Sequence, residues 1–425
     1  MIGGDLGLIH PYNKIPNERD SQMFKNDYKR AQIPLGPIII VLINAAISSD
    51  PFYMGYAFRC GIFQTISICI VVLFLSITSF KLFIKSWSFE KSYTYRDIWV
   101  GLYGPKYSIV PSLFVLSAYM SVAVLCTKEI YQNHIVAFEA LIGYIPNVIH
   151  NKWVFVYIST ASFSFPLLFR KSAHEFKGTS ILSKLSLLIA IGIICNKAFS
   201  RAKIEGWNPK QRIRFWSNDV EKSMVAFELF NTVFFINPIV PLVAKNIINP
   251  TQSKITSMVQ KTTIINAIIC IIAGLGTYLT VFDNNNGENI LFSFPKTEAS
   301  TRVALVAALL SNAFLCAFYV WLIAREISSL MHHGSEEYLH SRILCGILVI
   351  CLNAGLNFVN PTITFAFRVI GSFSFIVLNF VLPAIFYITA NWGNNILWSS
   401  ISIVHLIIAF PASTALIIYQ IRTHI

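Results

Sequence analysis

An acidic side chain and a proline interrupt the first long apolar segment of the chain, residues 35–58, in the run Ser48-Ser49-Asp50-Pro51. An unpaired ionised group at the centre of a bilayer costs roughly 3 kcal/mol or more, and a proline removes a backbone donor. Irregular backbone is tolerated at this depth where it is buried in protein or lines a wet cavity that binds substrates and ions. The run therefore predicts a binding site, while a plain proline kink with Asp50 paired to a basic side chain is the alternative.

A second apolar segment, residues 224–243, repeats this combination of an acid with helix breakers. It carries Glu228, Asn231, Asn237, Pro238 and Pro241. Interrupted helices at corresponding places in two halves of a membrane protein indicate an inverted repeat with a central site. We therefore expect Asp50 and Glu228 to face each other across that site, and at least one of these carboxylates to be functional rather than only paired.

The composition assigns both segments to a membrane protein. Hydrophobic residues make up 55% of the chain and charged residues 12%, which is far from the usage of a soluble domain. Windows of about 20 apolar residues, the length that spans a bilayer, indicate about eleven helices. We predict an all-α integral membrane protein.

The order of polar and apolar segments predicts the domain organisation. Residues 1–34 lack the apolar core of a signal peptide and are expected to form a cytosolic amino-terminal tail. Residues 35–425 are expected to form a single polytopic transmembrane domain, with a first repeat at about 35–200, a second at about 224–390 and an extra helix at 396–418. With eleven spans, the carboxyl terminus lies on the side opposite the tail.

Other classes of protein find little support. The net charge of +13 comes from basic residues scattered through short loops, which suits a lipid bilayer as partner and not nucleic acid. The eight cysteines have no metal-type spacing, so neither a metal nor a cofactor is expected. The histidines His332, His333 and His340 fall in a loop, and no nucleophile or metal cluster indicates an enzyme. Plasma membrane and a vacuolar or lysosome-like membrane both remain open as locations.

Several short motifs occur in one order along nearly the whole chain. They are Asn44-Ala45 with Tyr56-Ala57-Phe58, the runs at 93–97 and 103–105, Asn249-Pro250, the run at 289–295, Gly371-Ser372 and the run at 383–387. In these motifs the chain resembles the amino acid/auxin permease family, which includes sodium- and proton-coupled amino acid transporters and vacuolar amino acid transporters.

This resemblance implies a fold and an activity. The implied fold is that of the leucine transporter, with five helices, five inverted helices, and breaks in helices one and six. The implied activity is secondary active transport of amino acids by alternating access. The chain departs from the family pattern at Ser48-Ser49-Asp50, where Gly-Ser-Gly is usual, and at Asn231-Thr232, where Cys-His is usual. A channel, or a transport-deficient sensor or receptor of the same fold, remains an alternative.

The broken helices indicate which residues bind substrate. Free amides at a helix start suit a substrate carboxylate, and unwound carbonyls near Phe227–Phe230, or the carboxylates, can accept from its amino group. The predicted substrate-binding residues are Ser48, Ser49, Asp50, Phe227, Glu228, Phe230 and Asn231. Asp50 favours a cationic substrate.

The coupling ion is predicted as a proton or sodium. Asn44 resembles the position whose amide oxygen helps to hold sodium in coupled family members, together with a hydroxyl on helix eight, for which Ser311 is the first candidate and Thr301 the second. Amide and hydroxyl oxygens suit sodium, although such side chains also simply hydrogen-bond between membrane helices. Asp50 and Glu228 favour proton coupling instead, because carboxylates at membrane depth can carry a proton.

Overall fold

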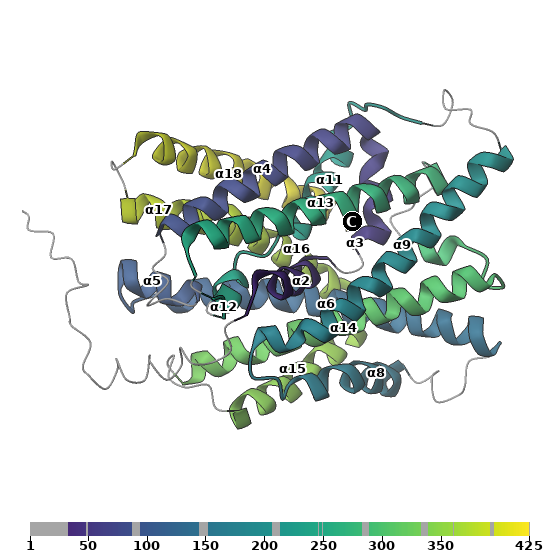
Figure 1. Cartoon of the computed structure of the whole chain (residues 1–425), viewed down its shortest axis with the longest axis horizontal. Helices are drawn as coiled ribbons and strands as arrows, with labels where there is room; N and C mark the ends of the chain where they lie inside the picture. The colour runs from purple at the N-terminus through teal and green to yellow at the C-terminus, as the bar shows by residue number, and fades with distance from the viewer. Residues whose placement is uncertain are drawn as a thin grey trace, which may run out of the picture.

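The computed structural model describes residues 33–47, 50–86, 94–143, 152–205, 213–244, 246–248, 250–282, 289–332, 339–359, 361–391 and 395–424. These residues form helices that run mostly along the long axis of the molecule (Figure 1). In chain order the elements are α2 (Leu35–Ala46), α3 (Asp50–Ala57), η1 (Phe58–Cys60), α4 (Ile62–Ser86), α5 (Tyr95–Tyr103), α6 (Ile109–Ile142), α8 (Lys152–Leu167), η2 (Ala173–Phe176), α9 (Lys177–Glu205), α11 (Val220–Val233), α12 (Val240–Ala244), α13 (Gln252–Val281), η4 (Ile290–Ser293), α14 (Ala299–Met331), α15 (Leu339–Val359), α16 (Pro361–Ile376), η5 (Val377–Val381), α17 (Leu382–Asn391) and α18 (Ile396–His424).

Most of these helices can cross a membrane. Among the described residues, eight are long and apolar enough for a span, and the bent pair formed by α2 with α3 and η1 makes a ninth. The shorter α8 and the interrupted pair α11 and α12 occupy the places of two further predicted spans. The all-α membrane class is confirmed, whereas the count of eleven spans and the repeat boundaries stay predictions.

Helix one is broken where the sequence predicted a break. The two parts, α2 and α3, are bent by 60° relative to each other. Ile47, which follows α2, has an extended backbone, and Pro51 lies in the first turn of α3, where a missing N–H is tolerated. In a continuous helix the residue at 51 would donate to the Ile47 carbonyl, and a proline cannot.

Helix six is broken later than the sequence predicted. The helix α11 continues through Val233, the chain is unwound from Phe234 to Ile239, and α12 begins at Val240. The predicted unwound carbonyls at Phe227–Phe230 therefore lie inside regular helix, because no proline occurs before position 238 to interrupt the hydrogen bonds of α11.

The two broken helices lie among long, intact ones. The helix α14 packs against α6, α9, α8 and α15, and most of the side chains in its apolar window are buried. The helix α3 packs closely on α13 through two glycines (Figure 1). A Cβ atom at Gly55 would overlap Thr277, and one at Gly274 would lie 2.5 Å from the Phe58 ring.

Polar contacts outside the regular helices join the two broken helices to each other and α5 to helix ten. At the amino-terminal end of α2, Ile33 donates to the Asn246 carbonyl at 3.0 Å, which forms an isolated β-bridge beyond α12. In helix ten the π-helical segment η5 presents its backbone to neighbours: the Leu378 carbonyl accepts from the Tyr95 hydroxyl at 2.9 Å. Such π-segments are frequent at functional sites.

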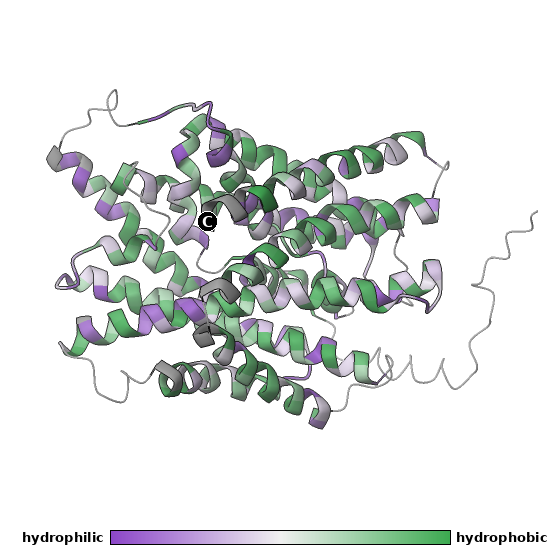
Figure 2. Ribbon diagram, turned by 180° about the vertical axis from the view of Figure 1, so that it is seen from behind, coloured by the Kyte–Doolittle hydropathy of each residue, from purple (hydrophilic) through white to green (hydrophobic). Residues whose placement is uncertain are grey.

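The outside of the bundle is apolar along the helices. Figure 2 shows hydrophobic colours over most of the helices, with hydrophilic residues gathering toward helix ends. Large apolar side chains such as Phe74 and Phe410 are exposed, at 66% and 77% of their surface. Exposed apolar side chains of this size suit contact with lipid and not with water.

Candidate functional site

A buried lysine occupies the break in helix one. Lys184 of α9 is 9% exposed, and its Nζ donates to the Ile47 carbonyl, the one that Pro51 leaves without a helical donor. Asp50, which begins α3, lies within electrostatic range of this ammonium group. The lysine therefore satisfies the end of α2 and supplies a counter-charge for the start of α3.

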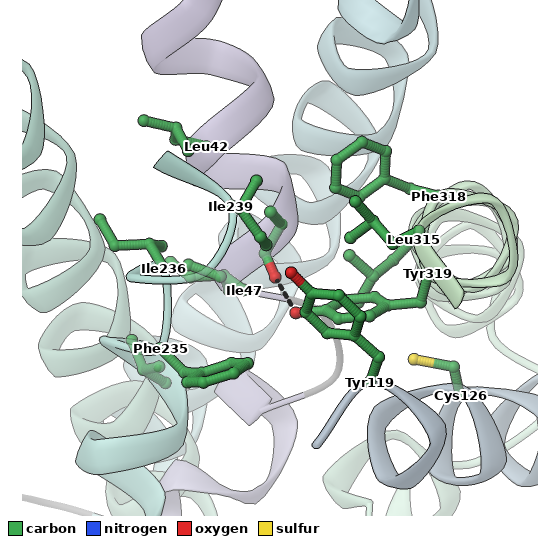
Figure 3. Packing of buried hydrophobic residues seen from close by; sticks show 14 of the residues in the cluster. Leu42, Ile47, Tyr119, Cys126, Phe235, Ile236, Ile239, Leu315, Phe318 and Tyr319 are labelled. Carbon is green, nitrogen blue, oxygen red and sulfur yellow. Dashed lines mark hydrogen bonds between the residues drawn. The ribbon is translucent and has the colours of Figure 1, made fainter. Parts of the chain in front are cut away.

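A tyrosine hydroxyl hydrogen-bonds to a second backbone carbonyl at the same break. The Tyr319 hydroxyl on α14 donates to the Ala45 carbonyl at 2.8 Å. Its ring meets that of Tyr119 on α6 edge-on, with 5.5 Å between the ring centroids. Figure 3 shows both hydroxyls pointing toward the end of α2 and the stretch that holds Ile239. Tyr119 thus places a second hydroxyl beside the break.

The break in helix six offers open backbone groups. Among the described residues, none donates to the carbonyl oxygens of Phe235 and Asn237. For Asn237 the cause lies in the sequence, because Pro241 follows four residues later and has no N–H to donate. Two carbonyls at membrane depth therefore keep their capacity to accept a hydrogen bond from a ligand.

Apolar side chains surround these polar groups. Leu42, Ile47, Phe235, Ile236, Ile239, Leu315 and Phe318 lie around the two tyrosines in one buried cluster (Figure 3). We call this arrangement, together with Tyr119, Tyr319, Lys184 and Asp50, the central site. It combines an apolar wall with hydrogen-bonding groups at its two backbone breaks, as small-molecule sites in proteins commonly do.

Glu228 does not face Asp50. Its Oε1 accepts from the Ser372 hydroxyl on α16 and from the Gln420 side chain on α18, both at 2.6 Å. Arg368, also on α16, lies within electrostatic range of this carboxylate. The expectation that the two carboxylates meet across one site is therefore wrong, because Glu228 lies on the face of α11 that packs against helices ten and eleven.

The other predicted substrate residues have varied surroundings. Ser48 and Ser49 lie outside the described residues. Phe230 is buried, with its ring centroid 6.2 Å from that of Phe234, whereas Phe227 is only partly buried. Asn231 accepts from the Asn379 side chain at 2.9 Å. Of the predicted set, Asp50 is the described residue that the structure places at the break in helix one.

The residues predicted to bind sodium are Asn44 and one of two hydroxyls on α14. Asn44, at the end of α2, is 1% exposed and its Oδ1 has no partner among the described residues. The Ser311 hydroxyl lies 3.4 Å from that of Ser183, the residue before Lys184. Thr301 lies ten residues earlier on α14 than Ser311, which is about 15 Å along the helix. The two alternative hydroxyls therefore lie nearly three helical turns apart, and which of them would join Asn44 stays a prediction.

Three residues of the central site were missed in the sequence. Lys184 could have been noticed, because a lysine within an apolar spanning segment is rare and is expected to have a functional partner. Tyr119 and Tyr319 carry no such signal, since tyrosine is frequent in membrane helices and 17 occur in the chain. Only the packing of α6 against α14 distinguishes these two.

The fold defines a class: a multi-pass α-helical membrane protein in which two of the helices are broken. The model of the transmembrane amino acid transporter protein family matches residues 36–423, nearly the whole chain. The chain belongs to this family, so the predicted membership and the association with amino acid transport are confirmed, and the chain is related to transporters and not to enzymes.

Comparison with solved structures supports the same fold. The structure of MhsT in complex with L-phenylalanine resembles this chain with a TM-score of 0.60 at 10% sequence identity. The likeness covers 90% of this chain and 98% of that one. The predicted leucine-transporter type of fold is therefore confirmed. Among curated proteins, no sequence matches the chain significantly.

Proposed function

We propose that the chain is a secondary active transporter that moves neutral amino acids by alternating access around the central site. The observation that carries this proposal is the pair of helix breaks, which come together beside Tyr119 and Tyr319. The open carbonyls of Phe235 and Asn237 suit the substrate ammonium group. The amides at the start of α3, with Ser48 and Ser49, suit its carboxylate.

The electrostatics of the break favour a neutral substrate. Asp50 alone would favour a cationic side chain, but Lys184 lies close enough to balance its charge. The remaining wall, which includes Phe235, Ile236 and Phe318, is apolar. An uncompensated charge on the substrate side chain would be costly to bury there.

We further propose that protons drive the transport. A sodium ion bound between Asn44 and Ser311 would need backbone oxygens of the same break, and the Lys184 ammonium already occupies the Ile47 carbonyl. Two cations this close repel each other strongly in a medium of low dielectric. A lysine can instead bind and release one proton in each cycle, with Asp50 as its partner. A proton gradient across the membrane that holds the chain would supply the driving force.

Reconstitution of the purified chain into liposomes tests these proposals. A pH gradient, acidic on the side from which substrate enters, should drive accumulation of labelled leucine or phenylalanine, and unlabelled amino acid on the other side should accelerate exchange. Replacement of sodium by choline should change nothing. Sodium dependence that is weakened in Asn44→Ala and Ser311→Ala would overturn proton coupling in favour of sodium.

Two other outcomes of the liposome experiment would overturn the proposal that the chain is a secondary active transporter. Binding of amino acid without any flux would identify a sensor or receptor. Flux without saturation or counterflow would identify a channel.

A further inference from the structure

A buried carboxylate next to the central site joins three parts of the chain. Glu129 lies on α6 and is 6% exposed. The Tyr53 hydroxyl of α3 donates to its Oε1, and the Asn289 side chain, which precedes η4, donates to its Oε2 at 3.2 Å. Both carboxylate oxygens are therefore used, each by a different element. We call these three residues the Glu129 clasp.

The clasp lies just beyond the central site along α6. Cys126, which Figure 3 shows beside Tyr119, precedes Glu129 by less than one helical turn, about 4.5 Å along the axis. Further along α6, Glu139 pairs with Lys296 at 2.6 Å, and both side chains are more than 40% exposed. The clasp thus lies between the central site and a water-exposed end of the bundle.

This end is opposite the one that carries the amino-terminal segment. The β-bridge between Ile33 and Ile247 joins the chain before α2 to the chain after α12. The clasp instead holds α3, the other half of helix one. With the predicted cytosolic amino terminus, the clasp belongs to the side of the membrane that faces away from the cytosol.

The geometry of the clasp suits an ionised carboxylate. The Asn289 Oδ1 already accepts from the Leu291 amide at 3.0 Å, so its Nδ2 is the atom directed at Glu129. An amide NH₂ can only donate, and it meets an acceptor on Glu129. A proton on Oε2 would set a donor against a donor. A proton on Oε1 would turn two charge-assisted hydrogen bonds into neutral ones, which are roughly half as strong.

Other charged groups near the clasp come from three elements. Lys128 is the neighbouring residue on α6, and Asp50 approaches from α3. Arg368 of α16 interacts with Tyr53. The carboxylate is thus surrounded by charges of both signs, one of which belongs to the central site.

We propose that Glu129 is a proton-binding residue that controls access to the central site from the non-cytosolic side. In its ionised form it fastens α3 and the segment at 289–293 to α6. When it binds a proton, the two hydrogen bonds weaken and α3 can move away from α6. This inference rests on the proposed transport function, and it assigns to Glu129 a role in opening the site that differs from the role of Lys184 in binding the driving ion.

Hydrogen exchange of the full chain in nanodiscs tests the clasp without requiring transport. In the wild type, exchange in peptides covering α3 and 289–298, corrected for the intrinsic effect of pH, should rise on acidification. Glu129→Gln has one acceptor atom in place of two, so exchange should be about tenfold faster at neutral pH and should no longer respond to acid. Glu139→Gln, on the same helix but in an exposed pair with Lys296, is the matched control and should behave as the wild type in the peptides covering α3.

A second variant covers the case in which Glu129→Gln does not fold. Tyr53→Phe removes one arm of the clasp with little change in shape, and it should give part of the same acceleration at neutral pH. Exchange at wild-type rates and with wild-type pH response in the folded variants would overturn the clasp. That result would leave the transport proposal intact, because liposome flux in the wild type is measured separately.

Discussion

The breaks in the two helices have the same cause, but the carbonyls left without a helical donor are treated differently by the surrounding chain. In each, a proline deprives the carbonyl four residues earlier of its helical donor: Pro51 at Ile47, and Pro241 at Asn237. At the first break the chain itself supplies new donors, the Lys184 ammonium for Ile47 and the Tyr319 hydroxyl for Ala45. At the second break, no described residue donates to Asn237.

This difference suggests a division of roles. The first break carries charge, through Lys184 and Asp50, and its carbonyls are occupied. The second break carries no ionisable side chain between Phe234 and Ile239, and no described residue donates to its Phe235 and Asn237 carbonyls. A proline thus leaves a carbonyl without its helical donor in both places. Whether that carbonyl is satisfied depends on the neighbouring helices: at the first break a lysine of α9 donates to it, and at the second break it stays available to a ligand. We therefore expect the first break to carry ion coupling together with the substrate carboxylate, and the second to bind the substrate ammonium group.

The largest effect should come from Lys184→Met. It leaves the Asp50 carboxylate and the Ile47 carbonyl without their buried partner, which costs about 3 kcal/mol or more of folding free energy. We expect pH-driven uptake to be lost and the melting temperature to fall, as measured in liposomes and by thermal unfolding of the purified chain. Lys177→Met, an exposed lysine at the start of the same helix, should leave both unchanged. Normal pH-driven uptake in Lys184→Met would remove the proposed difference between the breaks.

A smaller effect is expected from Pro241→Ala at the second break. Alanine restores an N–H that can reach the Asn237 carbonyl and compete with the substrate ammonium group. Loss of one hydrogen bond to a charged group predicts a Kd for amino acid about ten- to hundredfold higher, measured by binding to the purified chain. Pro166→Ala, a proline inside α8 away from both breaks, serves as the control. Equal affinities in the two variants would mean that the Asn237 carbonyl does not bind substrate.

Glu228→Gln should have a milder effect than either change at the breaks. The amide keeps one acceptor for Ser372 or Gln420 but loses the charge that strengthens both hydrogen bonds. We expect substrate affinity to stay within about threefold of wild type, while the melting temperature falls, because the contact of α11 with α16 and α18 is weakened. A loss of affinity as large as that of Pro241→Ala would place Glu228 in the substrate site after all.

The smallest effect concerns the start of α11, outside the membrane. Asp219 accepts from the amides of Glu221 and Lys222, and the Lys222 ammonium lies 2.9 Å from its Oδ2. The Lys222 side chain, with these amides, lowers the pKa of the Asp219 carboxyl below its usual value. A carboxylate with a lowered pKa stabilises the fold above the unfolded-state value of about 4, and this contribution is lost as the pH falls through the lowered value.

Two substitutions separate the parts of this contribution. Asp219→Ala should cost about 1 kcal/mol at neutral pH, mostly from the lost helix cap, because the ion pair is screened by solvent. Asp219→Asn keeps the cap and should remove only the dependence on acid. Thermal unfolding at several pH values measures both, and a pH dependence of Asp219→Asn equal to that of the wild type would contradict the assignment.

The sequence predicted those features that depend on local chemistry. Prolines and acids inside apolar segments located the break in helix one within a few residues, and the same signals indicated that helix six is also interrupted. The second break was predicted too early in the chain, near the acid at 228, whereas the prolines at 238 and 241 determine where the helix opens. Proline decides where a helix opens, whereas a carboxylate can be satisfied within an intact one.

Features that depend on distant packing were not predictable. Lys184 and Ile47 are 137 residues apart in the chain, and nothing local to either residue specifies the other. Glu228 was assigned to the wrong face, because neighbouring positions on a helix differ by about 100° and a single pattern cannot fix which side meets which partner. The sodium ligands were likewise chosen by residue type, and they stay predictions.

The close packing of α3 on α13 has a further consequence for the transport cycle. With no side chain at Gly55 or Gly274, the Thr277 and Phe58 side chains pack directly against the opposite backbones, so the two helices lie closer than any larger residue would allow. We therefore expect α3 to move together with α13. Release of α3 at one end of the molecule would then be transmitted along the 30 residues of α13 to its other end.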